Sequence, residues 1–382
     1  MINKIYLDYA AATPLDDQVL KAMQPYFSEN FYNPSATYLP ARQVRQELET
    51  ARHKVASTIG GRPAEIIFTS GATEANNLAI RGLMPRYPEA EVLVSSIEHE
   101  SVLEPAKIFK HKEIPVDEAG RIILNKLSNL ISDNTVLVSI MLVNNELGTI
   151  QPLREVSHLI KNIRKERLAN NNRTPIYLHT DAAQAANYAS LQASRLGVDV
   201  MSINGGKIYG PKQSGVLYIK SGLKLWPQIV GGGQEFGLRS GTENIAADIG
   251  FAVALETAQK NHATQAKRTS KLSLKFEEGL KKLPKASING SKNNRTPHIL
   301  SVTFDGMDNE RLMMKLDEAG ILCAVGSACS ASRDEPSHVL SAIGLSDDEA
   351  RSTLRFSLGK FTTESDIEKT LQKLQALTAS NR

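Results

Sequence analysis

The sequence predicts an α/β fold in which a largely parallel sheet with crossover helices precedes a smaller α+β part. Short apolar runs rich in β-branched residues recur between helical patterns, an order of segments that is typical of such a sheet. Their spacing indicates strands that are joined by helices and buried on both faces. The runs occupy residues 66–69, 92–94, 136–140, 176–179, 198–201 and 216–219.

The C-terminal third has a different pattern. Residues 252–283 are helical in pattern and rich in Lys and Glu, which indicates a long connecting helix. Residues 298–304 and 353–358 then alternate as strands do, and residues 366–377 indicate a final helix. A chain of 382 residues is also too long for one compact core, so two domains are expected. The expected division is a large domain of residues 14–255 and a small domain of residues 1–13 and 256–382.

Composition and charge exclude several classes of protein. The net charge of +4 is spread along the chain without a basic block, so no direct nucleic-acid partner is expected. No run reaches the roughly 18 apolar residues of a membrane span, and residues 1–8 lack the apolar core of a signal peptide. Two cysteines, Cys323 and Cys329, exclude a disulfide framework and favour a reducing compartment. We therefore expect a soluble, cytoplasmic protein.

Polar residues follow the predicted strands at their carboxyl ends, where ligands bind in an open parallel sheet. The turn at residues 70–74 opens a helix whose free N–H groups suit a phosphate. Taken singly, the other polar residues have ordinary explanations as a core histidine, a turn former, a helix cap and a solvated lysine. Their arrival at one sheet edge instead predicts a polar active site. They are His99, Asn145, Asp181 and Lys207.

Other cofactor motifs are excluded. Met201 stands where a nucleotide P-loop ending in Gly206-Lys207 would need its first glycine. The glycines at residues 231–233 lack the spacing of a dinucleotide-binding motif. Residues 97–100 do not match the helix of a zinc protease, and two cysteines so placed make no zinc site. No metal is therefore expected.

Cys329 lies in a run of small, uncharged residues, 326–332. A thiol in such a run meets a substrate only if the loop moves, and the run contains no Lys or Arg that would activate it. Taken alone, a free cysteine is more often a small buried apolar residue. Both interpretations remain open from these residues.

Motifs are spread over almost the whole chain, in residues 6–14, 33–35, 69–74, 98–99, 143–146, Asp181 with Gln184, 207–212, 239–242, 326–329, 335–337 and 355–359. Together they resemble those of the cysteine desulfurases, enzymes of the class V aminotransferase group that use pyridoxal 5′-phosphate (PLP). Members of this family supply sulfur for iron–sulfur clusters and thiolated tRNA. The resemblance implies the type I fold of PLP-dependent transferases, with a mainly parallel seven-stranded sheet and a smaller α+β domain.

The resemblance implies a role for each polar residue at the sheet edge. Lys207 would hold PLP as a Schiff base and move protons between the substrate and the cofactor. Asp181 would face the pyridine nitrogen and keep it protonated, while Gln184 would bond to the phenolic oxygen. His99 would stack on the ring and shuttle a proton. Other residues implied to contact the cofactor are Ala72, Thr73, Asn145, Asn204 and Thr242, the last reaching in from the second subunit of a homodimer.

The resemblance also implies L-cysteine as substrate. Asn33, Asn145 and Arg355 would orient its carboxylate, Arg355 through a bidentate pair. The strand pattern agrees, because Arg355 points away from the face that its apolar neighbours share. Cys329, as thiolate, would attack the substrate sulfur and carry it off as a persulfide, leaving L-alanine. The sulfur would pass to an acceptor protein, and Cys323 is expected to pack near the foot of the mobile loop.

Two positions beside the lysine depart from the family. Where the family usually has Ser-Gly-His-Lys, this chain has Asn204, Gly205, Gly206 and Lys207, so a hydroxyl and an imidazole are absent at the phosphate. Each charge-assisted hydrogen bond lost would cost about 1.5–3 kcal/mol. The amide of Asn204 is a candidate replacement for one of them.

Two alternatives belong to other functional classes. The chain could be another class V PLP enzyme, such as a selenocysteine lyase or an aminotransferase for small amino acids, for which the cysteine loop is incidental. Assaying alanine and sulfide against keto-acid products separates these activities. It could instead be a weakly active or non-catalytic sulfur-relay subunit, which the altered lysine motif permits and which absorbance of bound PLP would test.

Overall fold

The structure is a computed structural model that describes residues 4–326 and 336–379. Cys329 and most of its expected mobile loop lie outside the described residues. The strands are β1 (Ile5–Tyr6), β2 (Ile66–Thr69), β3 (Glu91–Ser95), β4 (Lys110–Ile114), β5 (Thr135–Ser139), β6 (Tyr177–Asp181), β7 (Val200–Asn204), β8 (Gly215–Ile219), β9 (Ala286–Asn289), β10 (Ile299–Phe304), β11 (Ile321–Leu322) and β12 (Thr353–Ser357). The α-helices are α1 (Asp17–Met23), α2 (Pro25–Ser28), α3 (Leu39–Ile59), α4 (Ala72–Leu83), α5 (Glu100–Lys107), α6 (Leu124–Leu130), α7 (Leu153–Ala169), α8 (Ala193–Leu196), α9 (Ile245–Leu280), α10 (Asn309–Glu318), α11 (His338–Ala342), α12 (Asp347–Ala350) and α13 (Glu364–Ala379).

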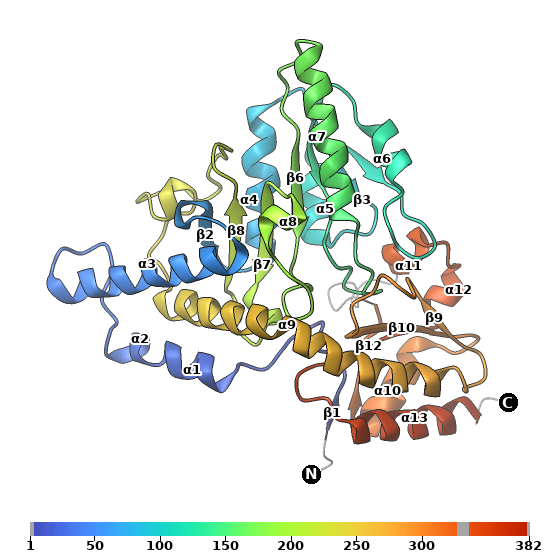
Figure 1. The fold of residues 1–382 in the computed structure, drawn as a ribbon. Helices are drawn as coiled ribbons and strands as arrows, with labels where there is room; N and C mark the ends of the chain where they lie inside the picture. The colour runs from blue at the N-terminus through green and yellow to red at the C-terminus, as the bar shows by residue number, and fades with distance from the viewer. Residues whose placement is uncertain (1–3, 327–335, 380–382) are drawn as a thin grey trace.

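A seven-stranded sheet forms the centre of the larger part (Figure 1), with the order β2-β8-β7-β6-β5-β3-β4. Only β8 runs antiparallel to its neighbours in this sheet, so the expected mainly parallel sheet is confirmed. All six strands predicted from apolar runs are present. The pattern missed β4, whose first four residues are polar and exposed. Charged residues of this kind are common on edge strands, where they discourage pairing with other chains.

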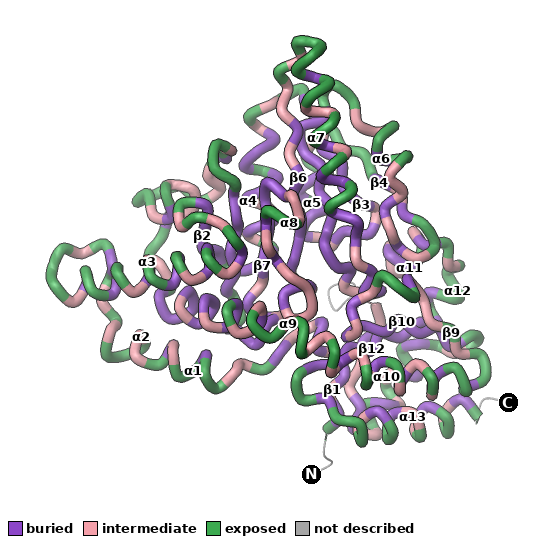
Figure 2. The backbone as a smooth tube through the Cα atoms, viewed as in Figure 1, coloured by how far each residue is buried: buried purple, intermediate pink, exposed green. Residues whose placement is uncertain are grey.

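Helices cover both faces of this sheet, as the buried strands require. Side chains of α3, α7 and α9 join one apolar cluster on one face, and side chains of α4 and α5 join a second cluster on the other. Figure 2 shows the strands as mostly buried and the outward sides of the helices as exposed. Because both faces are covered, a ligand reaches this sheet from the ends of its strands.

The smaller part is built around a three-stranded antiparallel sheet of order β12-β10-β9, with β1 and β11 forming a separate parallel pair. Leu7, Phe276, Leu354 and Phe356 belong to its apolar cluster. The long helix expected near residues 252–283 is α9, which begins earlier, at Ile245, and contacts both parts. The proposed domain boundary at residue 255 therefore falls inside a continuous helix and remains a prediction. None of the described helices is long and apolar enough to cross a bilayer.

Candidate active site

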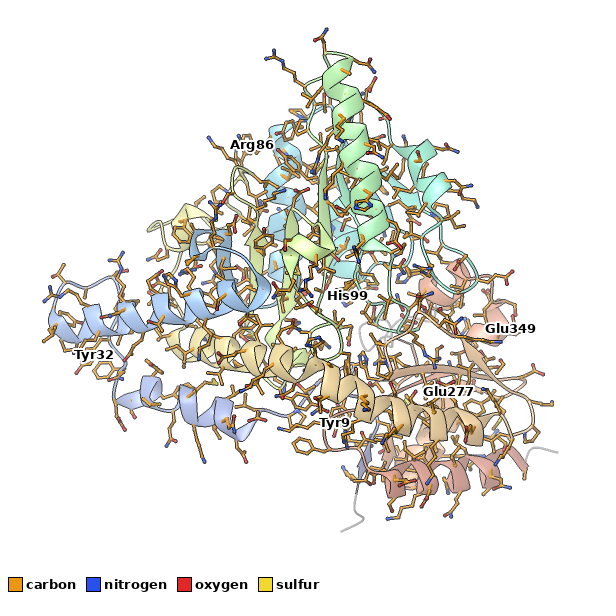
Figure 3. All side chains as sticks on the ribbon, viewed as in Figure 1. Tyr9, Tyr32, Arg86, His99, Glu277 and Glu349 are labelled. Carbon is orange, nitrogen blue, oxygen red and sulfur yellow. The ribbon has the colours of Figure 1, made fainter. Side chains whose placement is uncertain are left out.

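Five strands of the large sheet end at the same edge and deliver polar residues there. Asp181 and Asn204 are the last residues of β6 and β7, and His99 immediately precedes α5, which follows β3. Figure 3 places His99 toward the centre of the view, between the sheet and the C-terminal part. This arrangement confirms the geometric expectation that strand ends bring these side chains together.

A cavity of about 200 Å³ opens at this edge. Its lining combines a lysine, an arginine, a histidine, a carboxylate and several amides with small apolar residues. The lining residues are Ala10, Ala11, Ala72, Thr73, His99, Ser101, Met141, Val143, Asn145, Asp181, Ala183, Gln184, Asn204, Lys207 and Arg355. Most residues expected at a cofactor and substrate site thus share one cavity.

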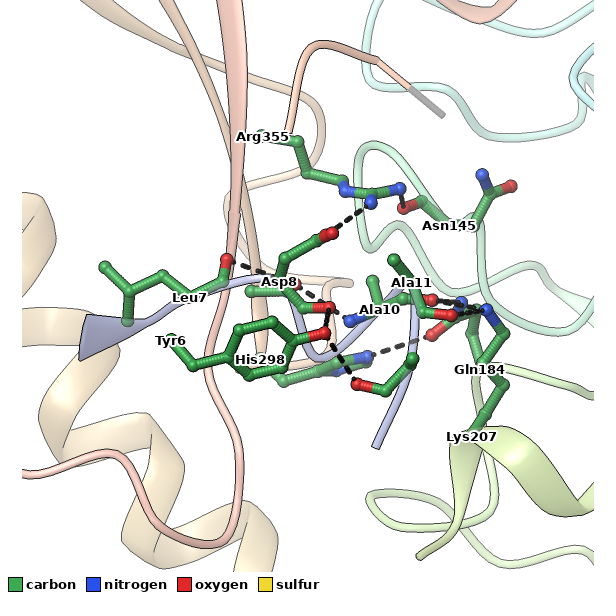
Figure 4. A network of polar contacts seen from close by, with 12 residues as sticks. Tyr6, Leu7, Asp8, Ala10, Ala11, Asn145, Gln184, Lys207, His298 and Arg355 are labelled. Atoms are coloured by element: carbon green, nitrogen blue, oxygen red, sulfur yellow. Dashed lines mark hydrogen bonds and ion pairs between the residues drawn. The ribbon is translucent and has the colours of Figure 1, made fainter. Parts of the chain in front are cut away.

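Lys207 ends a short 3₁₀ turn that follows β7. Its Nζ donates to the carbonyl oxygens of Ala10, at 2.8 Å, and Ala11 (Figure 4). The backbone of Lys207 is held as well, because Asn187 Nδ2 donates to its carbonyl oxygen at 2.8 Å. The turn therefore presents the amine to the cavity in a defined position.

Asp181 is buried, and both of its carboxylate oxygens accept hydrogen bonds. Asn76 Nδ2 donates to Oδ2 at 2.7 Å, and the Ala183 N–H donates to Oδ1 at 2.8 Å. Asn76 lies one turn after Ala72 on α4, so a helix that begins at the cavity also fixes the carboxylate. Burial raises the pKa of the neighbouring Glu98 well above its ordinary value, and the charge of Asp181 raises it further. The neutral form of Glu98 is therefore favoured.

His99 caps the start of α5. Its Nδ1 accepts a hydrogen bond from the Ser101 N–H at 3.0 Å and lies 2.8 Å from Ser101 Oγ. Ser101 Oγ in turn accepts from Asn76 Nδ2 at 2.9 Å. Because a backbone N–H must donate, Nδ1 is the acceptor nitrogen and a neutral ring carries its proton on Nε2. Sequence reasoning missed Asn76 and Ser101, although each lies within a turn of a residue that it singled out.

Gln184 is oriented by two contacts. Its Nε2 donates to the Ala10 carbonyl at 2.9 Å, and its Oε1 lies 3.5 Å from His298 Nε2 (Figure 4). The His298 ring stacks on Tyr188 with centroids 4.1 Å apart. Burial, reinforced by the charge of Arg355, lowers the pKa of His298 to about 3. His298 is thus neutral at physiological pH and suited to donate to the Gln184 oxygen.

Arg355 extends from β12 toward the cavity, with a side chain only 3% exposed. Its Nη2 donates to Asp8 Oδ1 at 2.7 Å and its Nη1 to the Asn145 carbonyl at 3.1 Å (Figure 4). The alternation predicted for this strand is confirmed, since Leu354 and Phe356 pack in the apolar cluster on its other face. The pairing of Arg355 with Asp8 was not foreseen.

The start of α4 and the end of β7 form the part of the cavity suited to an anion. Gly71, at φ 129°, precedes the helix, so the N–H groups of Ala72 and Thr73 lie at its N-terminus. Asn204 Oδ1 accepts from the Gly206 N–H at 2.8 Å. Asn204 therefore uses its oxygen within the turn and has its amide hydrogens to offer a ligand.

Two expected residues are not among those lining the cavity. Asn33 is exposed, and its Oδ1 accepts from the Ser35 N–H at 2.9 Å in a local turn. Thr242 is also exposed and lies outside the lining of its own chain's cavity. Cys329 falls outside the described residues. Within residues 4–326 and 336–379, no cluster of three or more His, Cys, Asp or Glu is placed to hold a metal ion.

Comparison with known proteins identifies the family. The aminotransferase class-V family model matches residues 5–370. A relative from Archaeoglobus fulgidus, cysteine desulfurase IscS 1, is 40% identical over 376 residues, which cover 97% of this chain and 95% of the relative. A solved NifS-like protein aligns with a TM-score of 0.90 at 34% identity, covering 99% of this chain and 100% of its own. The structure of SspA in complex with cysteine aligns with a TM-score of 0.80 at 36% identity, covering 94% of this chain and 100% of its own. The chain therefore belongs to the aminotransferase class-V family and, within it, to the cysteine desulfurases.

Proposed function

We propose that this protein is a PLP-dependent cysteine desulfurase that converts L-cysteine into L-alanine and transfers the sulfur to Cys329 as a persulfide. The observation that supports this most strongly is the single cavity that gathers the Lys207 amine, the buried Asp181 carboxylate and the Arg355 guanidinium. An amine, an acid and a carboxylate receptor are the groups that a PLP enzyme acting on an amino acid needs. The relatives named for this activity add independent support.

The cavity lining fits PLP. Lys207 offers an amine for covalent attachment, and Asp181 offers a carboxylate, held by two N–H donors, for a protonated pyridine nitrogen. The N-terminus of α4 and the Asn204 amide suit the phosphate. When bound there, PLP would supply an electron sink for breaking the Cα–H and C–S bonds of the substrate.

The protein's own groups would position the substrate and move its protons. Arg355 would bind the carboxylate, as a planar fork of N–H donors does well. Lys207 Nζ would accept and return the Cα proton, and the carbonyl oxygens that it contacts would stabilise its protonated form. His99 would present Nε2–H to the cavity, because its Nδ1 is engaged by Ser101.

The sulfur step requires a nucleophilic thiolate, and we assign it to Cys329. An S–S bond forms between Cys329 and the substrate sulfur while the C–S bond breaks. The electron pair of that bond passes to the substrate carbon, which takes a proton and becomes the methyl group of L-alanine. Burial raises the pKa of Cys323 to about 12, so that thiol stays protonated and is unsuited to the role. The proposed acceptor of the persulfide sulfur is a cytoplasmic protein.

The direct test is product analysis with purified, PLP-loaded protein. L-Cysteine should yield L-alanine and, with a reductant, sulfide in equal amounts, and no keto acid. Lys207→Ala should abolish turnover and the visible absorbance of lysine-bound PLP. Lys212→Ala is the matched control, because Lys212 lies five residues later and its Nζ donates to the Thr13 carbonyl at 2.7 Å, outside the cavity lining. Turnover by the Lys207 variant, or keto acid as the main product, would contradict the proposal.

We also propose that the enzyme is a homodimer in which Thr242 reaches the cavity of the partner subunit. The loop before Thr242 is tied to α4 by an ion pair between Arg239 and Glu74, at 3.0 Å. Mixing Lys207→Ala and Thr242→Ala chains tests this arrangement. If Thr242 acts in the other subunit, hybrid dimers contain one fully wild-type site and regain tight PLP binding. If it acts within its own chain, every site in the mixture stays defective.

A further inference from the structure

Asp8 holds the guanidinium that is proposed to receive the substrate carboxylate. Asp8 Oδ1 accepts from Arg355 Nη2 at 2.7 Å, and the two residues lie on adjoining segments joined by the parallel bridge between Asp8 and Ser357. No role was assigned to Asp8 from the sequence. A carboxylate that already pairs with this arginine is chemically the same group as the one that a substrate brings.

Both terminal nitrogens of Arg355 already donate one hydrogen bond each. Nη1 donates to the Asn145 carbonyl and Nη2 to Asp8, while Nε is buried and has no partner among the described residues. A bidentate pair with a carboxylate needs two parallel N–H groups. An incoming carboxylate that uses both terminal nitrogens must therefore share Nη2 with Asp8 or displace it.

Of the two residues of this ion pair, Asp8 is the one whose side chain is free to move away. The Arg355 side chain is 3% exposed and that of Asp8 is 19% exposed. The Arg355 backbone is fixed at both of its polar groups, because its N–H donates to the Ala324 carbonyl at 2.8 Å and its carbonyl accepts from the Ala324 N–H at 3.1 Å. The Asp8 backbone is also held, since Tyr6 Oη donates to its carbonyl at 2.9 Å. Only the short Asp8 side chain is left to rotate toward solvent.

Repulsion between two carboxylates favours exchange of Asp8 for the substrate carboxylate over simultaneous binding of both to Arg355. Arg355 is buried, so a single counter-charge stabilises it, and a second carboxylate beside the same guanidinium would be repelled by the first. Lys207 Nζ donates to the carbonyl oxygens of Ala10 and Ala11 and would be joined to PLP in the loaded enzyme, so Arg355 is left as the proposed receptor of the carboxylate. One carboxylate at a time is therefore the favoured state of this pair.

We propose that Asp8 is a built-in competitor for the substrate carboxylate, which neutralises Arg355 before substrate binds and releases it when a monocarboxylate arrives. This inference rests on the proposed function for the identity of the substrate. Asp8 thereby sets the KM for L-cysteine and keeps small anions from occupying Arg355. It is a specificity-determining residue that acts through Arg355.

Propionate tests the inference, because it carries the carboxylate without the amine or thiol that react at the site. Its dissociation constant is measured by calorimetry on PLP-loaded protein, together with the KM for L-cysteine. Asp8→Asn and Asp8→Ser remove the charge and should lower both constants by about tenfold or more, since one charge-assisted hydrogen bond is worth roughly ten- to 150-fold in affinity. Asp8→Glu keeps the charge and should lower neither.

The matched control is Asp16→Asn, because Asp16 pairs with Lys360 at 2.6 Å, on the same N-terminal segment but outside the cavity lining. It should leave both constants unchanged. Weaker or unaltered propionate binding in a folded Asp8→Asn or Asp8→Ser variant would overturn the inference and make Asp8 a plain support for Arg355. If no protein in the series, wild type included, turned over L-cysteine, the proposed function would fall, and propionate binding would still decide the role of Asp8.

Discussion

Gly206→His should tighten PLP binding by restoring an imidazole beside the phosphate end of the cavity. The site accepts a side chain with little movement. A Cβ at Gly206 would lie 3.3 Å from Asn204 Oδ1 and 3.9 Å from Lys212 Cγ, so Asn204 need shift by only a few tenths of an ångström. Gly206 is also not among the glycines with positive φ, so its backbone suits an L-residue.

The expected gain in PLP affinity comes from one added hydrogen bond between the imidazole and the phosphate. A charge-assisted bond from an imidazole N–H to a phosphate oxygen is worth about 1.5–3 kcal/mol, which is roughly a ten- to 150-fold lower dissociation constant for PLP. Gly206→Ala is the matched control, since it adds the Cβ and the loss of backbone freedom without the imidazole. Wild type, Gly206→Ala and Gly206→His are dialysed side by side while bound PLP is followed by absorbance, and dissociation constants are then measured by titration. Equal retention by the alanine and histidine variants would show that the Asn204 amide already provides what the imidazole would, and would refute this account.

Three further outcomes are expected. Cys329→Ser should bind L-cysteine but form no persulfide, as judged by alkylation and mass spectrometry, whereas Cys323→Ser should keep both properties; the reverse result would reassign the nucleophile. Glu235→Gln should lower the free energy of unfolding by about 3–5 kcal/mol in urea titrations, because Glu235 holds Arg52 in a buried two-bond pair with both distances at 2.7 Å; a loss near zero would contradict that role. Burial lowers the pKa of His179 from 6.5 to about 4, so its neutral form is favoured in the folded state, and the stability that it contributes above pH 6.5 is lost as pH falls toward 4. His179→Gln should flatten this part of the pH–stability curve, and an unchanged slope would refute the assignment.

Sequence patterns were informative where burial is uniform and the spacing is regular. Strands buried on both faces produce apolar runs, so β2 and β5 could be located from such runs, and the run at 198–201 included the first two residues of β7. An exposed edge strand such as β4 gives no such signal. The same logic placed Arg355 opposite its apolar neighbours, because the side-chain period of a strand is fixed. The site residues at strand ends were predictable for the same reason, since fold class alone brings those ends together.

Contacts between the N-terminal segment and the cavity were not predictable, because they depend on two parts of the chain that fold against each other. Asp8 and Arg355 are 347 positions apart, and contacts such as the pairing of β1 with β11 and the bridge from Asp8 to Ser357 bring them together. The same segment supplies the carbonyl oxygens that hold Lys207, and its Thr13 N–H donates to the Gly206 carbonyl at 3.1 Å. One short stretch of chain thus contacts Arg355, the proposed carboxylate receptor, the amine of Lys207, and the turn at Gly206, where the sequence departs from the family. Any movement of this stretch would alter all three together, so substitutions there are expected to change substrate and cofactor affinity jointly.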